Sequence, residues 1–475
     1  MPSVPPIPAE LWNQIPLAAQ AAILALVRRY EQRLQELHQK VSELQQRLRQ
    51  NSTNSSKPPS SDPPALKRAP PKTLSTKKAG GQRGHAKAQR ALVDHPDAIH
   101  DCKPTVCRHC QQPLHGDDPQ PLRHQVWDVP PVQPIVTEYR RHRLTCPRCG
   151  LTTCGSTPAG QDGPRLKAAC VLLTGAYRLS KAKAARLLND LFCIPLCAGQ
   201  VCATEAEVGQ QLKPVVDELL AAARQFPANV DETSMGRVRW LWVMVTAVAT
   251  VYQIASGRNR AALRALVGTD YRRVLTSDRH SIYSHLAEDR HQWCWSHVRR
   301  DFQAMVDRNN AGSAIGKELL AMSGQMLGWW KRVRDGTLTK VRFAGRLHAQ
   351  RAFRVRFRAV LVRGSMCGCV KTAGTCRELL RGEVSMFLFA FVEGVEPTNN
   401  AAERALRHGV LWRKQSYAPK SVAGSEYLAC IWSVVETCRQ QGRGVWDFLT
   451  ACMVAAAEGR VLPSLLTQPR DVHAA

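Results

Sequence analysis

Residues 229–256 read NVDETSMGRVRWLWVMVTAVATVYQIAS, and this stretch decides the fold of the second half of the chain. Val, Ile, Thr and aromatic residues are frequent in it, and these residue types favour strands. We expect one strand to end in Val230–Thr233 and two more to cover Arg239–Ala249 and Val251–Ser256. The apolar run Trp240–Ala255 is too short to span a bilayer. It therefore predicts two buried strands and no membrane segment.

Aspartates lie at the ends of two expected strands. Asp231 belongs to the end of the first, and after a helix from about Asn259 the strand Arg273–Asp278 ends in the second. Such strands, with a carboxylate on a later helix, are typical of a ribonuclease-H-like core. Magnesium binds hard oxygens through few carboxylates, and two ions can stabilise the attacking and leaving oxygens of an in-line displacement. Taken singly, each aspartate is better explained as a strand-end turn or a helix cap.

A third acid, Glu403, stands in the stretch VEPTNNAAERALR at residues 395–407. A helix should begin near Asn399 or Asn400. Spacings of three and four then place one acid, one amide and two arginines on a single helix face: Asn400, Glu403, Arg404 and Arg407. We interpret this face as part of a catalytic site; the alternative interpretation is a solvent-exposed helix face whose acid and arginines form salt bridges.

Two Cys-x-x-Cys pairs precede these strands. They are Cys107 with Cys110 and Cys146 with Cys149. Four thiolates can close a tetrahedral zinc site without an open position, so we expect a structural ion. Between the pairs, Val126–Tyr139 reads as extended segments broken by prolines, a small ribbon that needs metal to fold. Cys102 and Cys154 are spare candidates, and unrelated reduced thiols are the alternative.

The charge of the chain favours a polyanionic partner. Its 475 residues include 66 Lys and Arg against 38 Asp and Glu, for a formal net charge of +28. Charge alone does not separate DNA, RNA and membrane. The length predicts two or more globular units. Seventeen cysteines in a chain without a signal peptide indicate a reducing cytoplasm rather than a disulfide scaffold.

The N-terminal region carries a heptad pattern. Apolar residues recur at alternating steps of four and three: Ile23, Val27, Tyr30, Leu34, Leu37, Val41, Leu44 and Leu48. We expect a coiled-coil seam, with a parallel dimer favoured because one core position is partly β-branched; packing within one chain is the alternative.

Residues 51–84 are rich in Asn, Ser, Pro, Lys and Gly, which predicts a flexible basic arm that follows DNA phosphates, or a plain linker.

Two further patterns are weaker. Ser180–Phe192, a turn containing Pro195 and a second helix from about Ala198 form either a helix-turn-helix or two helices that only pack together. A second cysteine cluster has no evident fourth ligand, so we interpret its members as buried thiols: Cys367, Cys369 and Cys376.

Several motifs occur in order along the chain: NSSKPPSSD at residues 54–62, GGQRGH at 80–85, the paired cysteines, VDET at 230–233, CWSH at 294–297 and TNNAAER at 398–404. Together they resemble the transposases of the insertion-sequence-66 family. The resemblance continues through WRK at 412–414 and ETC at 436–438, so it covers nearly the whole chain. It implies a bacterial mobile-element enzyme with a leucine-zipper-like N-terminal helix, a zinc-binding domain and a DDE catalytic core of ribonuclease-H type.

The resemblance also implies site residues. Its catalytic triad falls on Asp231, Asp278 and Glu403, with magnesium or manganese as catalytic ion and zinc at the paired cysteines. The family usually has a glycine near the second acid, where this chain has Arg279 and His280. Supporting and DNA-binding residues are also expected, the former Asn400, Cys294 and His297, the latter Arg404, Arg407, Arg413 and Lys414. A metal role for the Cys-x-x-His pair would need two more ligands.

We therefore expect a multidomain α+β chain with seven segments. They are a coiled-coil helix (1–50), a flexible basic linker (51–100), a zinc-binding domain (101–160), a helical, possibly helix-turn-helix region (161–225), the first part of a ribonuclease-H-like core (226–302), a helical insertion (303–395) with helical patterning at Ile315–Trp330 and Phe387–Val392, and the catalytic glutamate helix with C-terminal helices (396–475).

The predicted function is DNA transposition by metal-dependent strand cleavage and strand transfer. The expected partners are the terminal inverted repeats and target DNA, a second copy of the chain, and accessory proteins of the same element. The alternative is a dimeric zinc-containing DNA-binding regulator with a degenerate nuclease core. Three acids in their motif settings favour the enzyme, since a regulator has no need to keep them.

Overall fold

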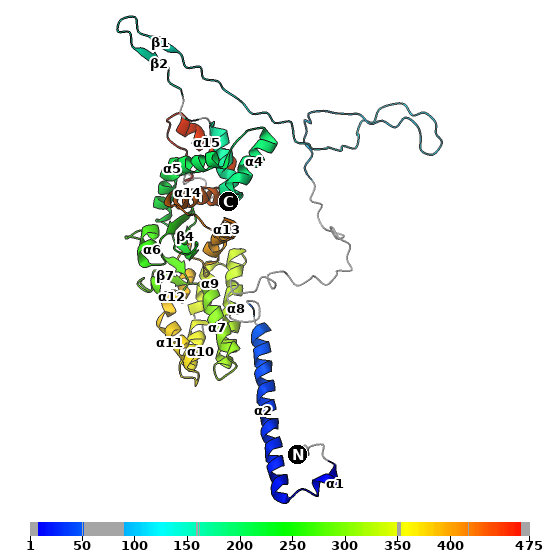
Figure 1. Ribbon diagram of the computed structural model, residues 1–475, viewed down its shortest axis with the longest axis vertical. Coiled ribbons are helices and arrows are strands. Elements are labelled where there is room, and N and C mark those ends of the chain that lie inside the picture. Colours follow the sequence, from blue (N-terminus) through cyan, green and yellow to red (C-terminus); the bar gives the residue numbers. More distant parts are fainter. Residues whose placement is uncertain are drawn as a thin grey trace. The chain divides into compact units, whose positions relative to one another are not determined.

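A computed structural model describes residues 8–49, 51, 90–157, 160, 162–348, 353–416 and 418–466. The chain divides into two compact units (Figure 1). The first contains residues 1–67, 159–185 and 196–475, and the second contains residues 68–158 and 186–195. Among the described helices, none combines the length and the apolar character needed to cross a membrane. The expected basic arm lies almost entirely outside the described residues.

A five-stranded mixed sheet lies at the centre of the larger unit. Its strands are β3 (Ala228–Ser234), β4 (Trp240–Val245), β5 (Thr250–Ala255), β6 (Leu275–Ser277) and β7 (His291–Trp293), in the spatial order β5-β4-β3-β6-β7. The first three form an antiparallel meander, and β6 and β7 run parallel to β3. The two buried strands predicted from the apolar run are confirmed as β4 and β5.

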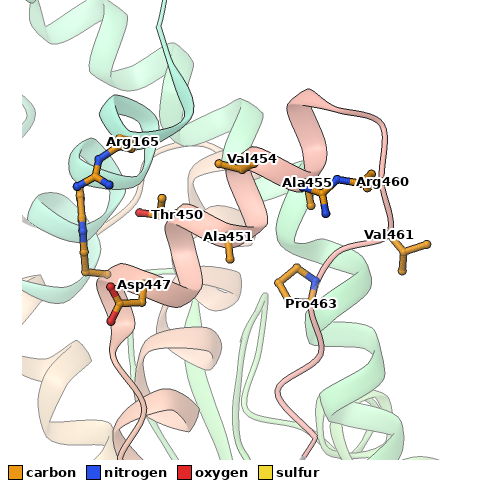
Figure 2. Close-up of a pocket in the computed structure, with 10 residues that line it drawn as sticks. Arg165, Asp447, Thr450, Ala451, Val454, Ala455, Arg460, Val461 and Pro463 are labelled. Atoms are coloured by element: carbon orange, nitrogen blue, oxygen red, sulfur yellow. The ribbon is translucent and has the colours of Figure 1, made fainter. Parts of the chain in front are cut away.

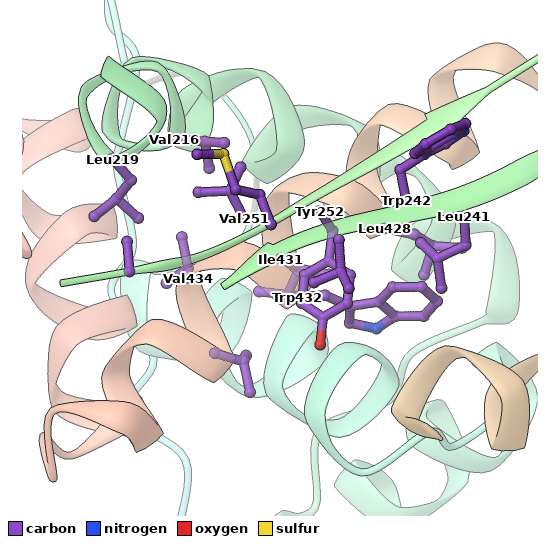
Figure 3. Packing of buried hydrophobic residues seen from close by; sticks show 14 of the residues in the cluster. Val216, Leu219, Leu241, Trp242, Val251, Tyr252, Leu428, Ile431, Trp432 and Val434 are labelled. Carbon is purple, nitrogen blue, oxygen red and sulfur yellow. The ribbon is translucent and has the colours of Figure 1, made fainter. Parts of the chain in front are cut away.

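Helices that precede the sheet, interrupt it and follow it in sequence complete its core. They are α3 (Pro164–Val171), the π-helical turn η2 (Leu172–Ala176), α5 (Ala198–Ala223), α6 (Arg260–Val267), α13 (Asn400–Ser416), α14 (Val422–Gln440) and α15 (Val445–Ala457). Figure 3 shows the packing of α5, α14 and the strands around Val216, Tyr252 and Trp432. The core therefore joins segments that are about 200 residues apart in sequence, and it requires the C-terminal helices.

The free edge of the sheet is closed by side chains of α14. The hydroxyl of Ser433 accepts a hydrogen bond from the Tyr252 backbone N–H at 2.9 Å. Thr437 Oγ1 accepts from the Thr250 N–H at 3.1 Å and donates to the Thr250 carbonyl at 3.2 Å. Since the two hydroxyls are one helical turn apart, they meet alternate residues of β5 and satisfy an edge that would otherwise attract another strand.

A second hydrophobic cluster belongs to the helices between β7 and α13. These are α7 (Trp295–Asp307), α8 (Ser313–Arg334), α9 (Lys340–His348), α10 (Phe353–Ser365), α11 (Val370–Arg381), α12 (Glu383–Phe387) and the 3-10 turn η4 (Leu388–Ala390). The helix expected at Ile315–Trp330 is confirmed within α8. The pattern at Phe387–Val392 is instead a short 3-10 turn after the end of α12, because its fully buried aromatic residues fill the cluster rather than one face of a helix.

The helical pair expected after the zinc region is present. Residues Lys181–Phe192 form α4, and α5 begins after Cys197, whose side chain and Gln200 make a reciprocal capping box. Near the N-terminus, α1 (Ala9–Trp12) precedes α2 (Leu17–Arg49), a single helix of 33 residues. Five of its predicted seam residues have exposed side chains: Tyr30, Leu34, Leu37, Val41 and Leu44.

The smaller unit contains little regular structure. Its hairpin joins β1 (Arg143–Thr145) to β2 (Thr152–Cys154), with Arg143 opposite Cys154. Val126–Tyr139, expected as extended segments broken by prolines in a small ribbon, contains no strand, and the paired ribbon lies after it at β1 and β2. Pro130, Pro131 and Pro134 lack the N–H that a ladder requires, so the chain is extended without forming a sheet.

Candidate active site

The first candidate acid, Asp231, is positioned by the centre of β3. It lies opposite Val243 of β4, which in turn lies opposite Tyr252 of β5, so these three residues share one face of the sheet. The hydroxyl of Tyr252 donates to the Ala405 carbonyl of α13 at 2.9 Å. The face that carries Asp231 is therefore the face on which α13 packs.

The second acid, Asp278, directly follows β6. Because Ala228 pairs with Leu275 and Asn229 with Thr276 in parallel register, the same register carried two residues further brings Asp278 beside Asp231. Asp278 Oδ1 accepts a hydrogen bond from the His280 backbone N–H at 3.0 Å. The predicted strand ending in an aspartate is confirmed.

The third acid, Glu403, lies in the first turn of α13, where the helix dipole favours a negative charge. The helix start is fixed by Asn399, which is fully buried. Its side-chain amide donates to the Val230 carbonyl at 3.0 Å, and its own carbonyl accepts from the Glu403 N–H at 3.1 Å. One residue thus links β3, just before Asp231, to the turn that carries Glu403.

The three acids repel one another in a poorly solvated place. Burial raises the pKa of Asp231 well above its ordinary value, and the charge of the adjacent Glu232 raises it further. Asp278 and Glu403 act in the same direction. Such mutual destabilisation is relieved by a bound cation, which favours the ionised form of every carboxylate around it.

The neighbouring acid, Glu232, has a different role. Its side chain is fully buried, and it accepts hydrogen bonds from Arg258 Nε at 2.6 Å and from the Tyr283 hydroxyl at 2.5 Å. Arg258 Nη2 also lies 3.7 Å from Asp278 Oδ2. Glu232 therefore pairs with Arg258 and positions it beside the second acid, although burial still raises the pKa of Glu232. The sequence pattern gave no signal for this network.

The N-terminus of α7 is bonded to the start of α13. The Cys294 N–H donates to the Ser277 carbonyl at 2.9 Å, and Cys294 Sγ accepts from the Asn399 N–H at 3.1 Å. Ser296 Oγ donates to Asn400 Oδ1 at 3.1 Å. The structure thus gathers the predicted supporting residues around Glu403, but the buried amide is Asn399, whereas Asn400 is exposed.

Three polar atoms at this junction are buried without a hydrogen-bond partner: His297 Nδ1, Asn399 Oδ1 and Glu403 Oε1. Burial is the largest cause that lowers the pKa of His297, so its imidazole is mainly neutral and keeps a free lone pair. Unsatisfied buried atoms of this kind are uncommon in folded proteins. Asn399 Oδ1 and Glu403 Oε1 carry lone pairs, as does His297 Nδ1 in the tautomer protonated at Nε2, so a bound cation suits all three atoms.

Arg279, one of the two residues that replace the expected glycine near the second acid, is held by ion pairs with α7 and α11. It pairs with Asp301 of α7 and, at 2.9 Å, with Glu378 of α11. Its guanidinium also lies 5.4 Å from the centre of the Trp293 ring. These contacts direct the Arg279 side chain toward α7 and α11.

The four predicted DNA-binding cations differ in their surroundings. Arg404, Arg407 and Lys414 are exposed. Arg413 is half-buried, and its guanidinium donates to the Ser234 hydroxyl at 2.9 Å and to the Ser234 carbonyl. Arg413 therefore anchors α13 to the end of β3. With Lys414, it also lines a pocket that contains Gly236.

The two cysteine pairs form similar turns. In the first, the Cys107 carbonyl accepts from the Gln111 N–H at 3.0 Å; in the second, the Cys146 carbonyl accepts from the Gly150 N–H at 2.8 Å. Backbone N–H groups at Cys110 and Cys149 are the largest causes that lower the pKa of Cys107 and Cys146, which favours thiolates. No three of the four sulfurs lie within 4.8 Å of one another.

Another pocket lies along α15 (Figure 2). Arg165 stacks on Trp446 there, with its guanidinium 5.4 Å from the ring centre. Asp447 is the one acid among the residues that line this pocket. A single carboxylate offers no cluster for metal-dependent chemistry. The candidate active site is therefore the set of three acids formed by Asp231 on β3, Asp278 directly after β6 and Glu403 on α13.

Three family models match parts of the chain. A family model described as "Transposase IS66 family" matches residues 160–427, which include all three candidate acids. A model described as "zinc-finger binding domain of transposase IS66" matches residues 104–150, which include both cysteine pairs. A family of unknown function, DUF6444, matches residues 9–91. No curated protein and no solved structure matches the chain.

Proposed function

Because the chain belongs to the transposase IS66 family and is a DNA transposase with a zinc-finger domain, we propose that Asp231, Asp278 and Glu403 are its catalytic carboxylates. The observation that carries this proposal is their convergence on one face of the sheet. Asp231 and Asp278 stand beside each other in the parallel register of β3 and β6, and α13 brings Glu403 to them.

We infer that the catalytic domain is a ribonuclease-H-like core. An antiparallel meander followed by two strands parallel to its first strand is the arrangement expected of that fold, with an acid on the first strand, an acid after the fourth and a third on a later helix. On this proposal the core is divided by a helical insertion at 303–395, and the segment 396–475 contains the glutamate helix α13 and the C-terminal helices α14 and α15.

The carboxylates and the unpartnered Glu403 Oε1 suit magnesium or manganese, which prefer oxygen ligands. When bound, such ions supply electrostatic stabilisation of the attacking and leaving oxygens. The protein holds Asp231 on a strand, Asp278 through the His280 N–H and Glu403 through the Asn399-anchored helix start. Each carboxylate is thus fixed by backbone rather than by a flexible loop, which favours preorganisation.

The reaction has two displacements. Water attacks phosphorus at the end of the element, and the P–O bond to the element's 3'-oxygen breaks. The freed 3'-hydroxyl then attacks a phosphorus of the target and loses its proton to solvent, while the P–O bond to the target's own 3'-oxygen breaks and that oxygen leaves as a 3'-hydroxyl. No covalent bond to the protein is needed. Exposed Arg404, Arg407 and Lys414 suit contacts with DNA phosphates, and half-buried Arg413 supports the helix that presents them.

The remaining segments provide binding and assembly. We propose that four thiolates of residues 101–160 share one structural zinc ion, and that this domain and the α4–α5 pair recognise the terminal repeats. We further propose that residues 1–50 form a coiled coil between copies of the chain, joined to the rest by the 51–100 linker. Accessory proteins of the same element complete the assembly.

The proposal is tested by separating cleavage from binding. Asp231→Asn, Asp278→Asn and Glu403→Gln keep size but remove charge, so cleavage of labelled element ends with magnesium should fall at least about 100-fold, while end binding at fixed salt persists. The matched control is Glu436→Gln on α14, away from the three acids, which should cut normally. Equal cutting by Glu403→Gln would remove Glu403 from the triad. Binding without any cutting by the unaltered chain would favour the DNA-binding regulator.

A further inference from the structure

One group of possible metal ligands occurs in the described part of the chain. It consists of Cys294 Sγ, His297 Nδ1 and Glu403 Oε1, which all lie within 4.8 Å of one another. Cys294 is the N-cap of α7 and His297 follows three residues later, while Glu403 comes from the first turn of α13. Two helix starts therefore direct a sulfur, a nitrogen and an oxygen toward one point.

The surroundings of this group are those of a formed ligand site. His297 Nδ1 and Glu403 Oε1 are 3.9 Å apart, and both are buried without a hydrogen-bond partner. The sulfur is oriented by the Asn399 N–H, and the two helices are held together by a hydrogen bond from the Trp295 N–H to the Pro397 carbonyl at 2.9 Å. Two polar atoms are thus removed from solvent close to each other and lack a protein partner, although such atoms are normally paired.

The chemistry of the donors selects the ion. Thiolate and imidazole suit zinc and similar borderline ions, whereas magnesium prefers carboxylates and water. Three protein ligands and one open position are a common zinc arrangement. In a tetrahedron with bonds of about 2.1 Å the ligand atoms lie about 3.4 Å apart. His297 Nδ1 and Glu403 Oε1, at 3.9 Å, need to approach by only about half an ångström.

We propose that Cys294, His297 and Glu403 bind one zinc-class divalent ion at a second site, separate from the cysteine pairs, and that this site shares Glu403 with the catalytic magnesium site. On binding, the Cys294 thiol releases its proton to solvent, and the three side chains donate electron pairs without any redox change. The sharing rests on the proposed function: a carboxylate held by zinc is less available to the catalytic ion, so zinc should inhibit cleavage.

Cobalt absorption tests the site directly. The full chain, with its finger first filled with zinc, is titrated with Co²⁺, which gives a thiolate-to-cobalt charge-transfer band when cysteine is a ligand. We expect the band in the unaltered chain and in Cys376→Ser, a matched change of a buried thiol on α11, and its loss in Cys294→Ser. His297→Gln should weaken cobalt binding at least about tenfold. Absence of the band from the unaltered chain, or its persistence in Cys294→Ser, overturns the site; if Cys294→Ser does not fold, His297→Gln decides.

A second measurement separates this inference from the proposed function. Magnesium-dependent cleavage is followed while zinc is added: we expect inhibition that excess magnesium relieves, and at least about tenfold more zinc for the same inhibition in His297→Gln. Cleavage that is insensitive to zinc at saturating occupancy overturns the sharing of Glu403. If cleavage requires Glu403 but the unaltered chain gives no cobalt band, the second metal site is wrong and the proposed function stands. If the unaltered chain gives the cobalt band but the Glu403→Gln variant still cleaves DNA, the catalytic assignment of Glu403 is wrong and the second metal site stands.

Discussion

At the scale of single residues, two neighbouring asparagines differ in burial and should therefore differ in their contribution to stability. Asn399 is buried and donates to the Val230 carbonyl, whereas Asn400 is exposed and accepts from Ser296. Asn399→Ala should destabilise the chain by about 1–3 kcal/mol because it leaves a buried carbonyl unpaired, and cleavage should fall because the α13 start is released from β3. Thermal unfolding and end cleavage measure both effects.

Asn400→Ala is the matched control for this prediction. Its exposed hydrogen bond should contribute much less, about 0.5 kcal/mol or below. If the two variants are equally stable and equally active, Asn399 does not anchor the glutamate helix.

The sequence predicted the acids of the site better than their supports. Asp278 directly follows a strand and Glu403 lies in the first turn of a helix, as expected, whereas Asp231, expected at the end of a strand, lies at the centre of β3. Asn399 and Asn400 are indistinguishable by residue type, and only the helix phase relative to β3 decides which is buried. The anchoring of Arg413 by Ser234 also depends on a contact about 180 residues distant, which no local pattern records.

At the scale of elements, the hydrogen bonds from α14 to β5 give a stability prediction. Thr437→Val keeps shape but removes the acceptor for the Thr250 N–H and the donor to its carbonyl. The free energy of unfolding should fall by about 1–3 kcal/mol, since both groups are buried. Denaturant unfolding measures this change.

Thr375→Val serves as the control on α11. That hydroxyl donates at 3.0 Å to the Lys371 carbonyl of its own helix, a carbonyl that the helix already satisfies. Similar stability of the Thr437 and Thr375 variants would contradict closure of the sheet edge by α14.

The exposed apolar row of α2 gives a second prediction at this scale. Leu37→Glu places a charge in the predicted seam, so it should weaken self-association at least about tenfold while the catalytic domain stays folded. Sedimentation of the full chain at micromolar concentration measures the oligomer. Glu36→Gln, off the seam and exposed, is the control. If the unaltered chain is monomeric, or if the oligomer of Leu37→Glu is unchanged, α2 does not form a seam between copies of the chain, and packing within one chain is the better interpretation.

Short polar strands explain where prediction of the elements failed. The apolar strands β4 and β5 were expected, but β7 reads His-Gln-Trp and shows no strand pattern. Gln292 is buried because its amide donates to the Met386 carbonyl at 3.1 Å and its oxygen accepts from the Phe389 N–H at 2.9 Å. A polar residue satisfied by a segment about 95 residues away cannot be recognised as core from its neighbours alone.

At the scale of the whole molecule, zinc removal should affect one unit and spare the other. The smaller unit has little regular structure and a hairpin with three residue pairs, so we expect it to unfold when metal is removed. Cys107→Ser should lower bound zinc and expose residues 101–157 to limited proteolysis, while the fragments of the larger unit stay protected. Full zinc retention by this variant would exclude the four-thiolate site.

Cys193→Ser is the control for zinc removal. This exposed thiol lies outside the two pairs, and its replacement should leave zinc content and proteolysis unchanged. Loss of protection throughout the larger unit after Cys107→Ser would show instead that the two units depend on each other for stability.

During synthesis the edge strand β5 is made well before α14, the helix that covers its edge. The ribosome completes β5 at Ala255, whereas α14 ends at Gln440. At about 5–20 residues per second, the intervening stretch of about 185 residues takes about 10–40 s. For that time the nascent chain presents an unpaired strand edge, which is a template for aggregation. Chaperone protection is therefore most needed before Ser433 and Thr437 emerge, and the carboxylate cluster can assemble only after α13, which carries Glu403, has been made.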